Sequence, residues 1–138
     1  MKKLKILFLD DDKERHKAFS KTMDRRLDQK GWGHEITYVW TANEAISKLK
    51  TEVFDEVFLD HDLGGESSQM TLPNSGQGSG YDVACFIATF PIEKRPNSVI
   101  IHSWNPEGAN RMARALSQAA EEGMHVAKVP FDPRWGVM

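Results

Sequence analysis

Five short runs rich in valine, isoleucine, leucine and phenylalanine recur along the chain and constrain its fold most strongly. These apolar runs cover residues 5–9, 35–39, 56–59, 98–102 and 125–129. Between them lie segments with helical periodicity, at residues 12–29, 42–50, 79–90 and 106–122. Strands that alternate with helices predict an α/β fold in which a parallel sheet carries helices on both faces. Because the runs ILFL and VIIH are apolar on both sides, they are typical of central strands buried by helices.

Local signals mark two helix starts and one missing helix. Thr41 followed by Glu44 indicates a capping box, and Asn105 precedes Pro106 at the start of a helix. Only the eight residues FDPRWGVM follow Pro130, which leaves no room for a helix after the fifth strand. We therefore expect one sheet face near that edge to be thinly covered. The tail could fold back over it, or a second copy could pair there as a homodimer.

Length and punctuation predict one domain with a single unusual loop. A chain of 138 residues fits one domain, so we expect residues 1–138 to fold as a unit. Residues 64–80, GGESSQMTLPNSGQGSG, contain five glycines and four serines without periodicity. A loop of this length inside a compact domain is usually a functional lid or a disordered insertion, and both alternatives stay open.

Charge and cysteine content exclude several classes of protein. A formal net charge of −2 argues against a broad basic surface for extended duplex nucleic acid, whereas a small phosphorylated ligand remains compatible. No apolar run approaches the roughly 20 residues that cross a bilayer, and MKKLKILFLDDD reads as a first strand rather than a signal peptide. The single cysteine, Cys85, cannot form an internal disulfide. We therefore expect a cytoplasmic protein with no membrane association.

Polar residues follow the predicted strands at the edge where an open parallel sheet binds its ligand. They are Asp10, Asp11 and Asp12 after the first strand, Asp60, His61 and Asp62 after the third, His102 and Ser103 at the fourth, and Lys128 in the fifth. Grouped carboxylates repel one another and are tolerated mainly beside a cation, although one aspartate could simply cap the first helix. Asp10, Asp11 and Asp62 are our candidate ligands for Mg²⁺, and nearby histidines would admit Mn²⁺.

The order of these residues resembles the receiver domain of bacterial response regulators over nearly the whole chain. The matching features are ILFLDDD, VFLD, a small hydroxyl residue after the fourth strand, and a lysine near Pro-Phe after the fifth. The resemblance implies a doubly wound sheet in the order 2-1-3-4-5, here without the last helix. It also implies Mg²⁺ at Asp10 and Asp11, a phospho-accepting role for Asp60, and a hydroxyl role for Ser103. Val129 separates Lys128 from the proline, which departs from the receiver pattern.

A narrower similarity joins LDDD with Arg15, DHDLGG, SGYD and HSWNPEG, and it points to the cyclic-phosphate processing receiver-like domains. That family implies hydrolysis or transfer at a cyclic phosphate, with histidines added to the receiver pocket. Ring opening needs a base, an acid and positive charge on the phosphate oxygens. We expect His61, His102 and Asp60 to be catalytic, with ordinary histidine pKa values near 6.5.

The remaining candidates would bind substrate or serve the fold. Arg15 could make a forked contact with phosphate, and Ser103 and Asn105 could face the substrate, although Asn105 is equally explained as a helix cap. We expect the other histidines to lie away from this edge, namely His16, His34 and His125. We expect the tryptophans to serve packing rather than stacking on a base. These are Trp32, Trp40, Trp104 and Trp135, of which Trp104 could still touch a base.

Two classes of function follow. The first is a metal-assisted phosphoesterase acting on a cyclic nucleotide or a 2′,3′-cyclic RNA end. The second is an atypical receiver phosphorylated at Asp60, or a nucleotide-binding or protein-interaction module without catalysis. The displaced Lys128 favours the enzyme, because a receiver uses that lysine to stabilise its phosphoryl group.

Overall fold

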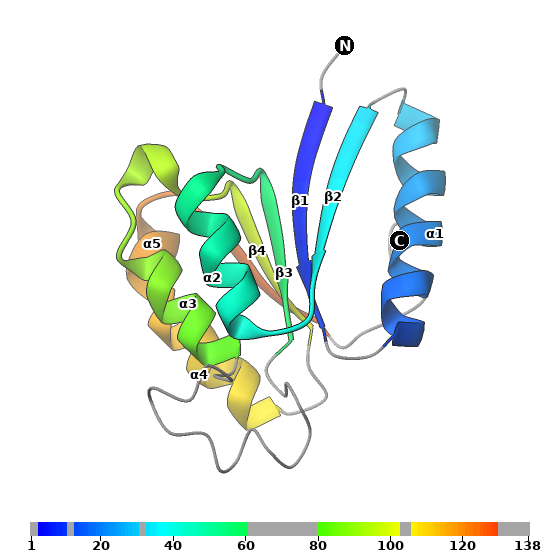
Figure 1. The fold of residues 1–138 in the computed structure, drawn as a ribbon. Coiled ribbons are helices and arrows are strands. Elements are labelled where there is room, and N and C mark those ends of the chain that lie inside the picture. Colours follow the sequence, from blue (N-terminus) through cyan, green and yellow to red (C-terminus); the bar gives the residue numbers. More distant parts are fainter. Residues whose placement is uncertain (1–2, 11–12, 31–32, 61–79, 103–105, 130–138) are drawn as a thin grey trace.

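The computed structural model describes residues 3–10, 13–30, 33–60, 80–102 and 106–129. Strands and helices alternate along them as the sequence predicted (Figure 1). The elements are β1 (Lys3–Leu9), α1 (Lys13–Lys30), β2 (Gly33–Val39), α2 (Ala42–Thr51), β3 (Glu56–Leu59), α3 (Gly80–Ala88), a 3₁₀ helix η2 (Ile92–Lys94), β4 (Ser98–His102), α4 (Pro106–Ala115), α5 (Ser117–Glu121) and β5 (His125–Val129).

All neighbouring strands pair in parallel, in the order β2-β1-β3-β4-β5. This confirms the predicted receiver-like order. Helices α2, α3 and α4 cover one face of the sheet, and α1 covers the other over β1 and β2 (Figure 1). Parallel strands all end at the same edge, so the residues that follow β1, β3 and β4 meet there.

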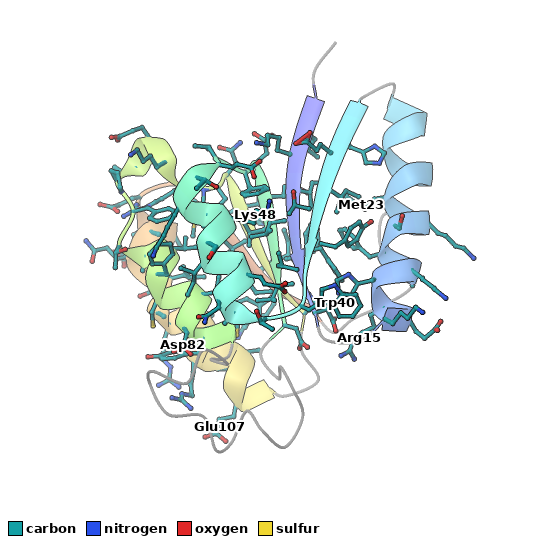
Figure 2. The ribbon with its side chains drawn as sticks, viewed as in Figure 1. Arg15, Met23, Trp40, Lys48, Asp82 and Glu107 are labelled. Atoms are coloured by element: carbon teal, nitrogen blue, oxygen red, sulfur yellow. The ribbon has the colours of Figure 1, made fainter. Side chains whose placement is uncertain are left out.

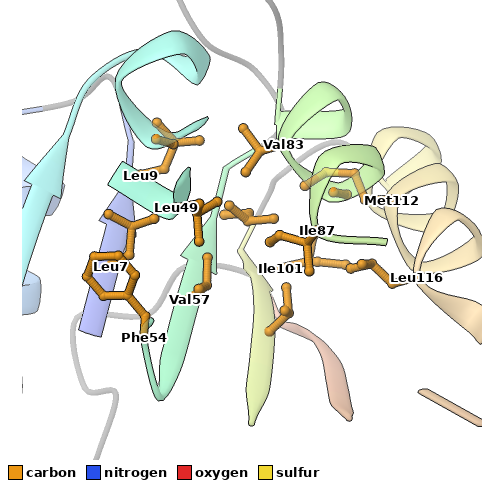
Figure 3. Close-up of a cluster of buried hydrophobic side chains, with 14 of the residues drawn as sticks. Leu7, Leu9, Leu49, Phe54, Val57, Val83, Ile87, Ile101, Met112 and Leu116 are labelled. Carbon is orange, nitrogen blue, oxygen red and sulfur yellow. The ribbon is translucent and has the colours of Figure 1, made fainter. Parts of the chain in front are cut away.

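The core consists of two apolar clusters, one on each face of the sheet. Alternate residues of β1 divide between them: Leu7 and Leu9 face α2 and α3, whereas Ile6 and Phe8 face α1. Figure 3 shows the larger cluster, in which β1, β3 and β4 pack against the helices. Because the second half of β1 buries side chains on both faces, residues 6–9 (ILFL) are all apolar, as expected of a central strand.

The helix starts agree with their sequence signals. Thr41 Oγ1 accepts a hydrogen bond from the Glu44 N–H, and the Glu44 carboxylate accepts one from the Thr41 N–H, which completes the capping box. Helix α4 begins at Pro106, also as expected.

One predicted helix, residues 106–122, divides into α4 and α5 at Leu116. The Leu116 backbone, with φ −97° and ψ 4°, leaves the helical region. Its N–H still bonds to the Met112 carbonyl, and its carbonyl accepts from Ala120. Near-continuous hydrogen bonding across the break explains why a single helical period runs through this part of the sequence.

The edge formed by β4 and β5 fits the expected thin coverage on the α1 side. Ile100 pairs with Ala127 in register, and both remain half-buried. Residues 130–138, for which no helix was expected, lie outside the described residues. The tail that could cover this face lies outside the described residues, so the homodimer stays a prediction. Among the helices described, none has the length and apolar character that crossing a membrane requires.

Candidate functional site

Three predicted site residues meet where β1, β3 and β4 end. Asp10 follows β1, Asp60 follows β3, and His102 is the last residue of β4. The Asp60 N–H donates to the Leu9 carbonyl at 3.2 Å, which ties the ends of two strands together. All three side chains are buried, with Asp10 fully inaccessible. Buried carboxylates need a counter-charge, so the question is which cation supplies it.

The counter-charge comes from Arg15, in the first turn of α1. Its Nε donates to both carboxylate oxygens of Asp10, at 3.0 and 2.8 Å. Its Nη2 lies 3.6 Å from Oδ2 of Asp60. One guanidinium therefore pairs with both carboxylates. Its side chain is 24% exposed, so part of the cation stays within reach of a ligand from solvent.

His102 is buried beside this ion pair. Its ring stacks on Phe8 with centroids 5.0 Å apart and an interplanar angle of 4°, and its Nδ1 lies 3.4 Å from Oδ2 of Asp10. Burial lowers the pKa of His102 to about 3, the charge on Arg15 acts in the same direction, and the Leu9 backbone opposes them in part. The ring is therefore neutral at physiological pH. The expectation of an ordinary pKa near 6.5 is wrong here, because burial and the adjacent guanidinium disfavour the imidazolium.

This pKa predicts how stability depends on pH. Since the pKa of His102 is about 3 in the folded chain and about 6.5 when unfolded, the unfolded state binds more protons between these values. The contribution of His102 to the free energy of unfolding is therefore fully present above pH 6.5. It falls by up to about 1.4 kcal/mol per pH unit as pH drops toward 3. Urea unfolding between pH 7 and 3.5 measures this slope.

The matched variants are His102→Asn, which removes the titrating group, and His125→Asn, which changes an exposed histidine at the other end of the sheet. The slope of unfolding free energy against pH should flatten more in His102→Asn than in His125→Asn. An identical slope in wild type and His102→Asn would contradict the lowered pKa.

His16 also lies at this edge, which sequence reasoning missed. Its Nε2–H donates to the Asp10 carbonyl at 2.8 Å, and its ring stacks on Trp40 with centroids 3.9 Å apart. The expected position away from the edge is wrong, although burial and a backbone hydrogen bond do fit the expected structural role. Its place directly after Arg15, one turn into α1, was the available signal. His34 and His125 lie near the beginnings of β2 and β5, at the opposite edge, as predicted.

Lys128 does not share the site in the way a receiver lysine would. It pairs in register with Ile101, whose side chain faces α3 and α4. Its Nζ donates to Oδ1 of Asn110 in α4, at 2.6 Å. Successive residues of a strand point to opposite faces, so inserting Val129 before the proline places the lysine on the α4 face. There it borders a surface hollow of about 480 Å³.

Gly80 explains the glycine in the SGYD motif. It begins α3 directly against the end of β3. A Cβ at this position would overlap the Asp60 carbonyl oxygen and lie 2.9 Å from its carbon. Only glycine therefore lets α3 approach the backbone that carries Asp60.

The other predicted site residues lie outside the described residues. They are Asp11, His61, Asp62, Ser103 and Asn105. Trp104 and the Gly/Ser-rich loop up to residue 79 also lie outside them.

The described residues fit a divalent cation only in part. Asp10 and Asp60 carry the oxygens that Mg²⁺ prefers, but Arg15 already bonds both oxygens of Asp10. Within the described ranges, no three histidine, cysteine, aspartate or glutamate side chains are grouped to hold a metal. A metal at Asp10 would therefore compete with Arg15.

Solved structures of response-regulator receiver domains share the fold at low sequence identity. A CheY-like receiver domain from Methylobacillus flagellatus is 19% identical, with a TM-score of 0.57, covering 94% of this chain and 89% of its own. The receiver domain of the sensor histidine kinase PA1611 from Pseudomonas aeruginosa PAO1 is 14% identical, with a TM-score of 0.59 and 98% of both chains covered. That structure holds a magnesium ion in its active-site cleft.

A response regulator from Burkholderia pseudomallei holds a phosphorylated aspartic acid, a calcium ion and citrate. It is 15% identical, with a TM-score of 0.54, covering 94% of this chain and 62% of its own. Similarity at these identities shows the fold alone.

The comparison with curated proteins gives no match. The model of one protein family, the cyclic-phosphate processing receiver domain, matches residues 5–118. The match spans β1 to α5 and includes Asp10, Arg15, Asp60 and His102. The chain therefore belongs to the family of cyclic-phosphate processing receiver domains.

Proposed function

We propose that the protein is a phosphoesterase that opens a cyclic phosphate, in a cyclic nucleotide or at a 2′,3′-cyclic RNA end. One observation carries the proposal: the Arg15 guanidinium bridges two buried carboxylates beside a neutral, buried histidine. This arrangement combines a phosphate-binding cation with a proton acceptor at the sheet edge where open α/β folds bind ligands. The family match supports a cyclic phosphate as the substrate class.

Arg15 is the proposed phosphate-binding residue. Asp10 fixes the guanidinium by accepting from Nε of Arg15. The Nη nitrogens of Arg15 can donate to phosphate oxygens. The pair with Asp60 is longer, at 3.6 Å, so a phosphate can compete for Nη2 more easily than for Nε. A cation already oriented in this way can stabilise negative charge that develops on the phosphate during ring opening.

His102 is a proposed catalytic base. A pKa of about 3 keeps it neutral and able to accept a proton, but makes it a weak base. The charge on Arg15 is one cause of that low pKa. An anionic phosphate bound to Arg15 would therefore raise the pKa of His102 toward neutral pH. His61 is the proposed acid for the departing alkoxide. Asp60 is the third catalytic candidate, and Ser103 and Asn105 are candidates for binding substrate.

Mg²⁺ or Mn²⁺ belongs to the proposal as a second source of positive charge on the phosphate oxygens. Asp10, with Asp11 and Asp62, would hold it, in competition with Arg15 for the Asp10 carboxylate. The receiver domains that hold magnesium or calcium support this assignment.

The alternative function is an atypical receiver phosphorylated at Asp60, or a binding module without catalysis. Its support is the position of Asp60, buried at the end of β3. The orientation of Lys128 toward Asn110 argues against it, because that lysine cannot then neutralise a phosphoryl group as in receivers. Phosphoryl uptake from acetyl phosphate, lost in Asp60→Asn, would support the alternative.

The test is a panel of 3′,5′-cyclic, 2′,3′-cyclic, and cyclic di- and trinucleotides, each with Mg²⁺, Mn²⁺ or EDTA. Ring opening should occur for at least one class. It should fall at least about 100-fold in His102→Ala, the scale of general acid–base catalysis. Lys128→Met is the matched control and should retain wild-type turnover. If wild type opens no cyclic phosphate with either metal, the proposal is wrong.

A further inference from the structure

Trp40 exposes a large aromatic ring at the same end of the sheet as the proposed phosphate site. It is 41% exposed, and only Val53 and Ile92 join it as exposed large apolar side chains in the described part of the chain. It directly follows β2, as Asp10 follows the neighbouring strand β1, and the Asp10 N–H donates to the Val39 carbonyl at 3.3 Å. Figure 2 shows Trp40 and Arg15 close together where α1 begins.

Trp40 is held by contacts with α1 and α2. Its ring stacks on His16 at a centroid distance of 3.9 Å and an interplanar angle of 13°. Its backbone N–H donates to the Glu44 carboxylate at 2.7 Å, in the capping box of α2. One ring face is therefore covered by a buried imidazole, while much of the side chain remains in contact with solvent. Packing over His16 accounts for the stacked face but not for the 41% of Trp40 that stays exposed.

Asp10 links this ring to the phosphate-binding arginine. The Asp10 carbonyl accepts a hydrogen bond from His16, whose ring stacks on Trp40. The Asp10 carboxylate accepts one from Arg15. Two adjacent residues of α1, Arg15 and His16, thus both bond to Asp10. They bring the guanidinium and the Trp40 ring close to the same aspartate. A nucleotide has the matching parts, a flat base and a phosphate joined by a sugar.

We propose that Trp40 is the stacking platform for the base of the substrate, so the substrate is a nucleotide or RNA end rather than a cyclic phosphate without a base. This inference rests on the proposed function and adds to it the residue that binds the base. A tryptophan face stacks on any base with little preference among the four, because every base offers a π-face. Selectivity for base identity is therefore expected to be weak at this position.

The test compares two ligands that share a five-membered cyclic phosphate, adenosine 2′,3′-cyclic phosphate and glycerol 1,2-cyclic phosphate, in binding and in turnover. Trp40→Ala should weaken binding of the adenosine compound by about 5- to 150-fold, the range of single-base stacking. Binding of the glycerol compound should not change. Trp40→Phe should keep most of the affinity, since it retains an aromatic face. Ile92→Ala, which removes another exposed apolar side chain, is the control.

The outcomes separate this inference from the proposed function. If Trp40→Ala weakens both ligands equally, or neither, Trp40 only packs on His16 and the inference is wrong while phosphoesterase activity stands. The proposed function fails only if wild type opens neither compound nor any cyclic nucleotide of the panel. Calorimetry of adenosine 2′,3′-cyclic phosphate binding then still tests the platform. Binding that weakens in Trp40→Ala would support it, and no binding to wild type would overturn it.

Discussion

Replacing Arg15 with alanine should lower the free energy of unfolding by about 2–4 kcal/mol and abolish phosphate binding. Removing one member of a buried ion pair typically costs about 3–5 kcal/mol, and the partial exposure of Arg15 reduces that figure. The cost arises because the fully buried Asp10 carboxylate would lose both hydrogen bonds from Nε. Urea denaturation measures the first effect, and calorimetry with adenosine 2′,3′-cyclic phosphate measures the second.

A double-mutant cycle separates loss of the ion pair from other effects of Arg15→Ala. Asp10→Asn removes the charge that needs compensation. The double variant Arg15→Ala/Asp10→Asn should therefore lose much less stability than the sum of the losses in the two single variants. Lys17→Ala is the matched control on α1, because Lys17 is exposed and only approaches Glu14 at 3.9 Å. Its effect should stay below about 0.5 kcal/mol. Additive single changes would contradict the account of Arg15 as the counter-charge of Asp10.

Replacing Gly80 with alanine should destabilise the protein by about 3 kcal/mol, at the upper end of the usual range for overpacking. The added Cβ would overlap the Asp60 carbonyl, and backbone on both sides of this contact leaves little freedom to move. Either α3 shifts away from the sheet or Asp60 is displaced. Thermal and urea unfolding measure the stability, and turnover should fall further than stability alone explains, because Asp60 lies in the proposed site.

Gly123→Ala provides the matched control. Gly123 has a φ of 112°, which disfavours an alanine, but in the described part of the chain no atom beyond its two neighbours lies within 4 Å of the added Cβ. Backbone strain alone should cost about 1–2 kcal/mol and leave turnover unchanged. If Gly80→Ala proved no more harmful than Gly123→Ala, the close contact between α3 and Asp60 would not be important.

The sheet could be predicted from the sequence because each strand has its own local signature. Runs apolar on both sides can be buried only between two layers of helices, as Leu7 and Phe8 show in β1. The changed position of Lys128 could also be predicted. A shift of one residue along a strand moves a side chain to the opposite face of the sheet, so the extra Val129 indicated that Lys128 does not act as a receiver lysine. The structure shows Lys128 on the α4 face, where it pairs with Asn110.

The electrostatics of the site could not be predicted in this way. The pKa of His102 depends on burial against Phe8 and on the guanidinium of Arg15, which lies in a helix far away in the sequence. Neither effect follows from the sequence neighbours of His102. The contact between His16 and Trp40 joins α1 to the end of β2 and leaves no trace in residue spacing. Sequence reasoning proposed Arg15 as a phosphate-binding residue but did not predict its ion pairs with Asp10 and Asp60.

The most direct test of the central claim is a ³¹P NMR time course of adenosine 2′,3′-cyclic phosphate with the wild-type protein, Arg15→Ala, His102→Asn and Lys128→Met. We predict that wild type and Lys128→Met convert the cyclic resonance into that of a single monoester isomer, whereas the other two variants leave it unchanged. One isomer is expected because a site that positions acid and base expels one defined oxygen. A cyclic resonance that disappears equally fast with Arg15→Ala would contradict the account. So would one that persists with wild type in both Mg²⁺ and Mn²⁺ for this compound and for every other cyclic nucleotide of the panel.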